Sequence, residues 1–132
     1  MKIIIDTHYL LWVLFDTNKL TENEKQILTD TENEIFVSSV SIWEISLKFS
    51  IGKLELKDFS PSELVEIIKK TGFKLIDLTG QDASNFHLLP KVGNSDPFDR
   101  MLIWQAISRK YFFLSRDKNI KYFKNLGLKI LT

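Results

Sequence analysis

Short apolar runs alternate along this sequence with longer segments whose apolar residues recur at helical spacing. Five runs are rich in Ile, Val, Phe and Leu, as strands buried on both faces are. They cover residues 3–5, 34–37, 73–78, 111–114 and 128–131. Helical patterns lie at residues 9–15, 40–51, 61–70, 81–89 and 97–109, and one more helix is expected to begin near residue 21. The alternation predicts a three-layer α/β fold, with a central parallel sheet of four to five short strands flanked by helices.

Capping signals support several of these helix boundaries. Thr21 followed three positions later by Glu24 is typical of a capping box at a helix start. Ser60 directly before Pro61 is typical of an N-cap followed by the first helical residue. Gly52 is suited to end the helix that precedes it.

Composition limits the chemistry that the chain can perform. Its 132 residues, 44% of them hydrophobic, fit one domain spanning residues 1–132. Eighteen basic and 17 acidic residues leave a net charge of +1, which excludes nucleic-acid binding through bulk positive charge. Cysteine is absent, and two histidines are too few for a histidine-rich zinc site. Metal or acid–base chemistry must therefore rest on carboxylates.

The sequence also bears on location. No apolar run reaches the length of a signal peptide or of a membrane span. We therefore expect a cytoplasmic protein.

Two acids directly follow predicted strands. Asp6 comes after the strand at residues 3–5, and Asp117 follows the strand at 111–114 after Ser115 and Arg116. In a parallel sheet these strand ends share one edge, where ligands bind in such folds. Each acid could instead serve only as a helix cap or turn residue.

Glu44 lies inside the predicted helix at residues 40–51. This helix is apolar on two faces, and Glu44 falls close to the centre of the face that holds Val40, Trp43 and Leu47. A glutamate in such surroundings must be paired, bind a cation or reach into a crevice. The simplest alternative is an ion pair with Lys48, one turn further along the helix.

Asp96 and Asp99 open the helix at residues 97–109. Asp96 precedes Pro97 and is suited to the N-cap, which is its favoured role. Asp99 shares a helix face with Ile103 and Ala106, so we expect it to point toward the core or a crevice.

Several carboxylates on one sheet edge need a compensating cation, because neighbouring negative charges disfavour each other's ionisation. Oxygen ligands without Cys or His favour Mg²⁺ or Mn²⁺ over zinc. Such an ion can polarise a phosphodiester and activate water, and without it an acidic site would repel RNA or DNA. These acids therefore indicate a metal-dependent hydrolase.

Four segments in order resemble the PIN domain, in the branch of the VapC-like toxins of bacterial toxin–antitoxin pairs. They are Ile-Asp-Thr at residues 5–7, Ser-Ser-Val-Ser-Ile-Trp-Glu-Ile at 38–45, Asp-Pro-Phe-Asp-Arg-Met-Leu-Ile at 96–103 and Leu-Ser-Arg-Asp at 114–117. Each segment alone is weakly specific. Their order and spacing cover essentially the whole chain, which makes the set more specific.

The resemblance implies a Mg²⁺- or Mn²⁺-dependent endoribonuclease with a PIN-like sheet-and-helix fold. It implies that the catalytic, metal-binding acids are Asp6, Glu44, Asp99 and Asp117, with Asp96 as an auxiliary acid. It also implies that Thr7 and Ser115 orient water or phosphate. The implied partners are an RNA substrate, a cognate antitoxin and a second copy of the chain.

One feature departs from the family pattern. Many relatives carry a histidine just before Asp-Pro-Phe-Asp, whereas this chain reads Gly93-Asn94-Ser95 before Asp96. Any role of that histidine is therefore absent or changed, while the acids themselves are intact.

Basic residues beside the acids are candidates for substrate contacts. Arg100 follows Asp99 and Arg116 precedes Asp117, so both are expected to bind phosphate unless they are simply structural. The apolar stretch at residues 9–15 is a candidate surface for a partner.

Two alternatives to a nuclease stay open. A non-catalytic PIN-like module would bind RNA or protein without cleaving it. A phosphatase-type Mg²⁺ hydrolase also begins with a strand and an acid, but it needs a second acid where this chain has His8.

Overall fold

A computed structural model describes residues 1–131 of the chain. Its β-strands are β1 (Lys2–Ile5), β2 (Glu34–Ser38), β3 (Lys74–Ile76), β4 (Phe112–Leu114) and β5 (Lys129–Leu131). Its α-helices are α1 (Thr7–Phe15), α2 (Glu22–Thr29), α3 (Ser39–Ser50), α4 (Leu64–Lys70), α5 (Gly80–Asn85) and α6 (Pro97–Arg109). Shorter 3₁₀ segments are η1 (Thr17–Lys19), η2 (Pro61–Glu63), η3 (Phe86–Leu88) and η4 (Lys118–Leu126).

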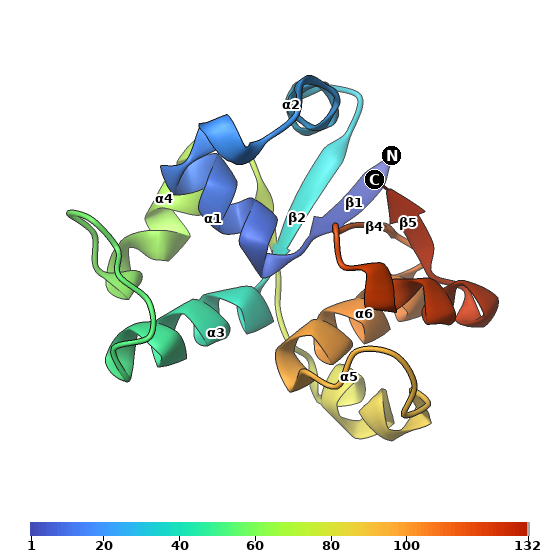
Figure 1. Cartoon of the computed structure of the whole chain (residues 1–132). Coiled ribbons are helices and arrows are strands. Elements are labelled where there is room, and N and C mark those ends of the chain that lie inside the picture. The colour runs from blue at the N-terminus through green and yellow to red at the C-terminus, as the bar shows by residue number, and fades with distance from the viewer. Residues whose placement is uncertain (132) are drawn as a thin grey trace.

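All five strands run parallel in one sheet of order β3-β2-β1-β4-β5 (Figure 1). The predicted parallel sheet is therefore confirmed, with β1 at its centre and β5 at an edge. The chain leaves β1 for β2 on one side and later returns to β4 on the other. Parallel sheets with such a reversal open a crevice at the carboxyl ends of the two strands involved.

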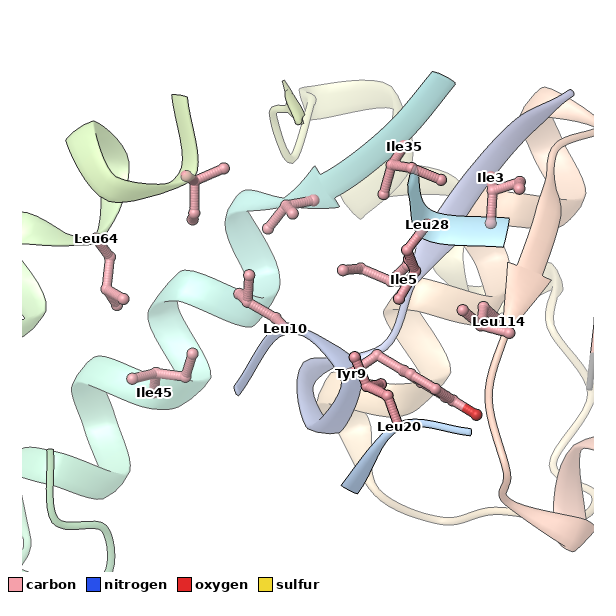
Figure 2. Packing of buried hydrophobic residues seen from close by; sticks show 12 residues of the cluster. Ile3, Ile5, Tyr9, Leu10, Leu20, Leu28, Ile35, Ile45, Leu64 and Leu114 are labelled. Carbon is pink, nitrogen blue, oxygen red and sulfur yellow. The ribbon is translucent and has the colours of Figure 1, made fainter. Parts of the chain in front are cut away.

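Hydrophobic side chains of β1 divide between two cores because successive strand residues point to opposite faces. Ile3 and Ile5 belong to a cluster with side chains of α1, α2, α3 and α4, which Figure 2 shows from close by. Ile4 belongs to a second cluster, formed with α6 and η4. In Figure 1, α1 and α4 lie on one side of the sheet and α6 on the other. The three-layer prediction is thus confirmed.

The predicted capping signals form as hydrogen bonds. The Thr21 hydroxyl accepts from the Glu24 N–H at 3.1 Å, while the Glu24 carboxylate accepts from the Thr21 N–H at 2.8 Å. Ser60 and Glu63 form the same reciprocal pair at the start of η2, which leads directly into α4. The sequence therefore specifies these helix starts locally.

Two predicted elements differ from the structure. The third strand covers only residues 74–76, because its sole partner β2 ends at Ser38, which pairs with Ile76. The helix predicted at residues 81–89 is divided into α5 and η3. Neither change affects the strand ends that carry the candidate acids.

Helix α3 leaves part of its surface uncovered. Trp43 and Ile51 are 58% and 56% exposed, although the apolar pattern suggested a packed face, while Glu44 and Ile45 are buried. The helix packs against α1, α6 and η2 and is therefore covered on only part of its circumference. No helix among residues 1–131 is long and apolar enough to cross a membrane.

Candidate active site

Asp6 and Ser115 are brought together by the pairing of the two central strands. Ile5 pairs with Leu114, the last residues of β1 and β4, and the Asp6 N–H donates to the Leu114 carbonyl at 3.2 Å. Asp6 and the segment from Ser115 onward consequently leave the sheet side by side. At this edge the strand order reverses. The sequence predicted a ligand site at the same edge.

Three of the predicted acids also cap helices. Oδ1 of Asp6 accepts from the Tyr9 N–H at 3.0 Å, and Oδ1 of Asp117 accepts from the Asn119 N–H at 2.9 Å. Oδ1 of Asp96 accepts from the first turn of α6, as its favoured role predicted. A carboxylate that caps with one oxygen is held in a fixed orientation and still offers the other. Capping and a functional role are therefore compatible here.

A pocket of about 280 Å³ lies at this edge of the sheet. Its walls come from the ends of β1 and β4, from α1, from the first turn of α6 and from η4. The lining side chains are Asp6, His8, Trp12, Asp99, Phe113, Ser115, Arg116, Asp117 and Ile120. Three of the four predicted catalytic acids thus share one pocket.

Asn94 connects two of these acids and was not singled out by sequence reasoning. Its side-chain nitrogen donates to Oδ2 of Asp99 at 2.9 Å and to Oδ2 of Asp117 at 2.6 Å. Its oxygen accepts from the Asp96 N–H at 2.7 Å. In the sequence Asn94 looks like an ordinary loop residue, because Gly-Asn-Ser is typical of turns. The only available signal was its position in the segment where the chain departs from the family pattern.

Among the residues that the structure describes, none of the three pocket acids is in an ion pair, although His8 and Arg116 also line the pocket. Burial raises the pKa of Asp99 to about 6, and the negative charges of Asp96, Glu44 and Asp6 add to this rise, while the hydrogen bond from Asn94 opposes it. Burial also raises the pKa of Asp6, although hydrogen bonds from the Tyr9 N–H and Ser115 oppose the change. Neighbouring carboxylates that are buried or half-buried and have raised pKa values favour binding of a cation.

Glu44 lies beside the pocket and is buried in a polar network. Its Oε1 accepts from the Thr7 hydroxyl at 2.7 Å, and its Oε2 lies 2.5 Å from Nζ of Lys48. Thr7 Oγ is also 2.9 Å from the Ser41 hydroxyl. Because Thr7 has one hydroxyl hydrogen and gives it to the carboxylate, Ser41 donates to Thr7. The alternative ion pair predicted for Glu44 is therefore present, and the hydrogen bond that Lys48 donates to Glu44 raises the pKa of Lys48.

The donor atoms of the pocket suit Mg²⁺ or Mn²⁺ in kind, because they are carboxylate oxygens. Within residues 1–131, however, no three acidic or histidine side chains converge closely enough to enclose one ion. The bridging amide of Asn94 lies between two of the acids instead. Asp6, Asp99 and Asp117 are the residues that could hold a cation, with Glu44 beside them.

A protein-family model for the PIN domain matches residues 3–126. The chain belongs to the PIN domain family. A search of curated proteins gave no match. Among solved structures, the chain is similar to one in VapBC2 of Rickettsia felis, solved with a promoter DNA fragment (TM-score 0.66, 16% identity, 99% of this chain and 98% of that chain covered).

Two further structures have the same fold. One is DNA-bound VapBC of Salmonella typhimurium, with a TM-score of 0.63 at 17% identity over 99% of this chain and 97% of that chain. The other is FitAcB of Neisseria gonorrhoeae, also with a TM-score of 0.63, at 14% identity over 98% and 96% of the two chains.

In this PIN domain the Arg100 guanidinium is bound to the loop that precedes α6. It donates to the carbonyls of Leu89 at 3.1 Å, Pro90 at 2.8 Å and Asn94 at 3.1 Å, and the residue is buried. The predicted phosphate contact does not fit this arrangement, since the donors are already used by backbone carbonyls. Arg100 fixes the loop in front of α6 instead.

The other predicted substrate contacts are also engaged within the protein. Arg116 lines the pocket, but its guanidinium is paired with Glu24 at 2.5 Å and donates to the Lys19 carbonyl at 2.7 Å. Thr7 gives its hydrogen to Glu44, so it holds an acid rather than a free water or phosphate. Ser115 is buried and accepts from the Asp117 N–H at 3.1 Å. Thr7 and Ser115 therefore hold other groups of the site in place. Arg116 is bound through Nε and Nη2, while its Nη1 makes no hydrogen bond within residues 1–131, so its phosphate contact stays a prediction.

Proposed function

We propose that this PIN domain is a Mg²⁺- or Mn²⁺-dependent endoribonuclease and the toxin of a toxin–antitoxin pair. The observation that carries the proposal is the pocket lined by Asp6, Asp99 and Asp117, none of which is ion-paired within residues 1–131. The phosphodiester backbone of RNA is negatively charged, so a substrate site made of carboxylates alone would repel it. A bound divalent ion removes that repulsion.

Each residue has a definite part in this proposal. Asp6, Asp99, Asp117 and Glu44 would hold the ion, which supplies polarisation of the phosphodiester and a water of lowered pKa. Asp96 anchors the start of α6 and so fixes where Asp99 stands. Thr7 and Lys48 hold the Glu44 carboxylate from both sides.

The antitoxin partner is supported by several structural neighbours that come from VapBC and FitAB structures. A groove of about 610 Å³ lies between α1 and the loop at residues 54–59, and Trp12 lines both this groove and the acidic pocket. A peptide in the groove would therefore reach the acids. The exposed stripe of α3 with Trp43 and Ile51 is the proposed contact with a second copy of the chain.

The direct test is cleavage of a labelled mixed-sequence RNA by purified protein with Mn²⁺ or Mg²⁺. Wild type should cleave, EDTA should stop the reaction, and Asp6→Asn should be inactive while keeping the circular dichroism spectrum of wild type. Asp77→Asn is the matched control, because Asp77 follows β3 at the same edge of the sheet but is exposed. Cleavage that persists in EDTA would contradict the metal requirement.

Expression in a bacterial host tests the toxin role separately. Wild type should arrest growth, Asp6→Asn should not, and co-expression of the protein encoded next to the gene should relieve the arrest. RNA binding without cleavage or growth arrest would instead favour the non-catalytic module.

A further inference from the structure

The loop before α6 is held rigidly from inside the protein. Arg100 donates to four of its carbonyls and lies over the rings of Phe86 and Phe123, with the guanidinium carbon 5.7 and 5.9 Å from the ring centres. A buried arginine needs all these contacts, because no carboxylate compensates its charge among the bonds that it makes. The arginine therefore fixes the path of the backbone from Leu89 to Asn94.

Gly93 fixes the same loop from the other side. Its φ is +67°, and a Cβ at this position would lie 2.5 Å from the Asn119 carbonyl oxygen and 3.2 Å from the Tyr122 ring. Only glycine allows the backbone to approach η4 so closely. Arg100 and Gly93 together set where the next residue, Asn94, must stand.

The orientation of the Asn94 amide follows from its partners. The Asp96 N–H can only donate, so the atom that faces it at 2.7 Å is the Asn94 oxygen. The NH₂ group then faces the two acids, and its two hydrogens match Oδ2 of Asp99 and Oδ2 of Asp117. A donor with partial positive charge thus bridges two carboxylates that would otherwise repel each other.

We propose that Asn94 is a positioning residue that stands in for the cation, holding Asp99 and Asp117 together until a divalent ion displaces its amide. The inference rests on the proposed metal-dependent function and deepens it. An ion ligated by the same two oxygens would lie about 2.1 Å from each, where the amide hydrogens now point. The ion and the bridging NH₂ group compete for one position, so binding requires the amide to withdraw.

This competition predicts the effect of removing the amide. In Asn94→Ala, metal binding no longer has to break two hydrogen bonds to charged groups, so the variant should bind Mn²⁺ about tenfold more tightly than wild type. It should also melt at a lower temperature than wild type in EDTA, because Asp99 and Asp117 then face each other without a donor. Ser95→Ala, at the exposed next residue, is the matched control and should change neither property.

Titration of Mn²⁺ followed by electron paramagnetic resonance measures affinity without any RNA substrate. If wild type binds Mn²⁺ and Asn94→Ala binds it equally or more weakly, Asn94 is not displaced and the inference is wrong, while the proposed nuclease function stands. If Asn94→Ala binds more tightly but no RNA is cleaved, the inference holds and the proposed function fails. A wild type that binds no Mn²⁺ overturns both.

Nuclear magnetic resonance of the unaltered protein gives a second measurement, which does not depend on the variant folding well. The side-chain NH₂ signals of Asn94, assigned through their correlations with the backbone resonances of the same residue, should move on saturation with Mg²⁺ as both hydrogen bonds to the acids break. The NH₂ signals of Asn33, whose amide donates to the Ile27 carbonyl far from the pocket, should stay in place. Asn94 signals that do not move under saturating Mg²⁺ would overturn the displacement.

Discussion

Two groups of acids in this protein differ in their partners. Glu24 is paired with Arg116 at 2.5 Å and accepts from the Tyr9 hydroxyl, and hydrogen bonding from Arg116 lowers its pKa to about 2. Asp82 is paired with Arg109 at 2.9 Å and accepts from Gln105 at 3.0 Å. Burial alone would raise its pKa, but these donors bring it to about 2.

The acids at the sheet edge have no such arginine. Asp6 and Asp99 have raised pKa values, and the bridging partner of Asp99 is the neutral amide of Asn94. Arg100 and Arg116 stand next to the pocket acids in sequence, yet one binds backbone carbonyls and the other binds Glu24. The chain thus pairs Glu24 and Asp82 with arginines but leaves Asp6 and Asp99 without an ion pair within residues 1–131. In the proposed function a divalent cation would compensate these pocket acids.

The largest predicted difference between the two groups is in catalysis. Asp99→Asn should lower the rate of RNA cleavage by at least about 100-fold, because a change at a proposed metal ligand should exceed the 10–100-fold loss typical of residues that only support the ligands. Asp82→Asn should leave the rate per folded molecule within a few-fold of wild type, since Asp82 lies outside the pocket. Cleavage assays at a temperature where both variants are folded compare them directly. An equal loss of cleavage rate in both variants would contradict the distinction between the pocket acids and the arginine-paired acids.

Much of the fold was predictable because its determinants are local. Runs of β-branched and aromatic residues marked the five strands, and Thr21 with Glu24 marked the start of α2 before any contact was known. The topology rule then placed Asp6 and Asp117 at one edge, although they are far apart in sequence. Local pattern and sheet geometry were sufficient for these features.

The contacts of the basic residues were not predictable in the same way. Arg116 and Glu24 are 92 positions apart, and Arg100 reaches carbonyls of a loop whose path no sequence pattern specifies. Adjacency in sequence to an acid suggested a phosphate contact for both arginines, but it could not show that they bind partners within the fold. The role of Asn94 was not predictable for a related reason, because an asparagine in a turn and an asparagine that bridges two acids look alike in sequence.

Replacing an acid by its amide should change the free energy of unfolding in opposite directions in the two groups. At pH 7 in EDTA, Glu24→Gln should lower the free energy of unfolding by about 1–3 kcal/mol, because Arg116 and Tyr9 lose a charged partner. Asp99→Asn should raise it by about 1 kcal/mol, since it removes a charge that burial and neighbouring acids disfavour. Urea unfolding of both variants beside wild type measures these differences. A loss of stability in Asp99→Asn would show that the negative charge of Asp99 does not destabilise the folded protein.

The smallest and most specific predicted effect is the change with pH in the stability difference between wild type and Glu24→Gln. The pKa of Glu24 is about 2 in the folded protein against 4.5 ordinarily, so the unfolded chain binds the proton more readily. The carboxylate therefore stabilises the fold fully above about pH 4.5, and this contribution is lost as the pH falls toward 2. Urea unfolding between pH 7 and pH 3 should show the difference between wild type and Glu24→Gln shrinking below pH 4.5. The stability difference between wild type and Asp82→Asn should also shrink at low pH, because the pKa of Asp82 is lowered as well. A difference that stays constant down to pH 3 would mean that packing, rather than the charge of Glu24, accounts for its contribution.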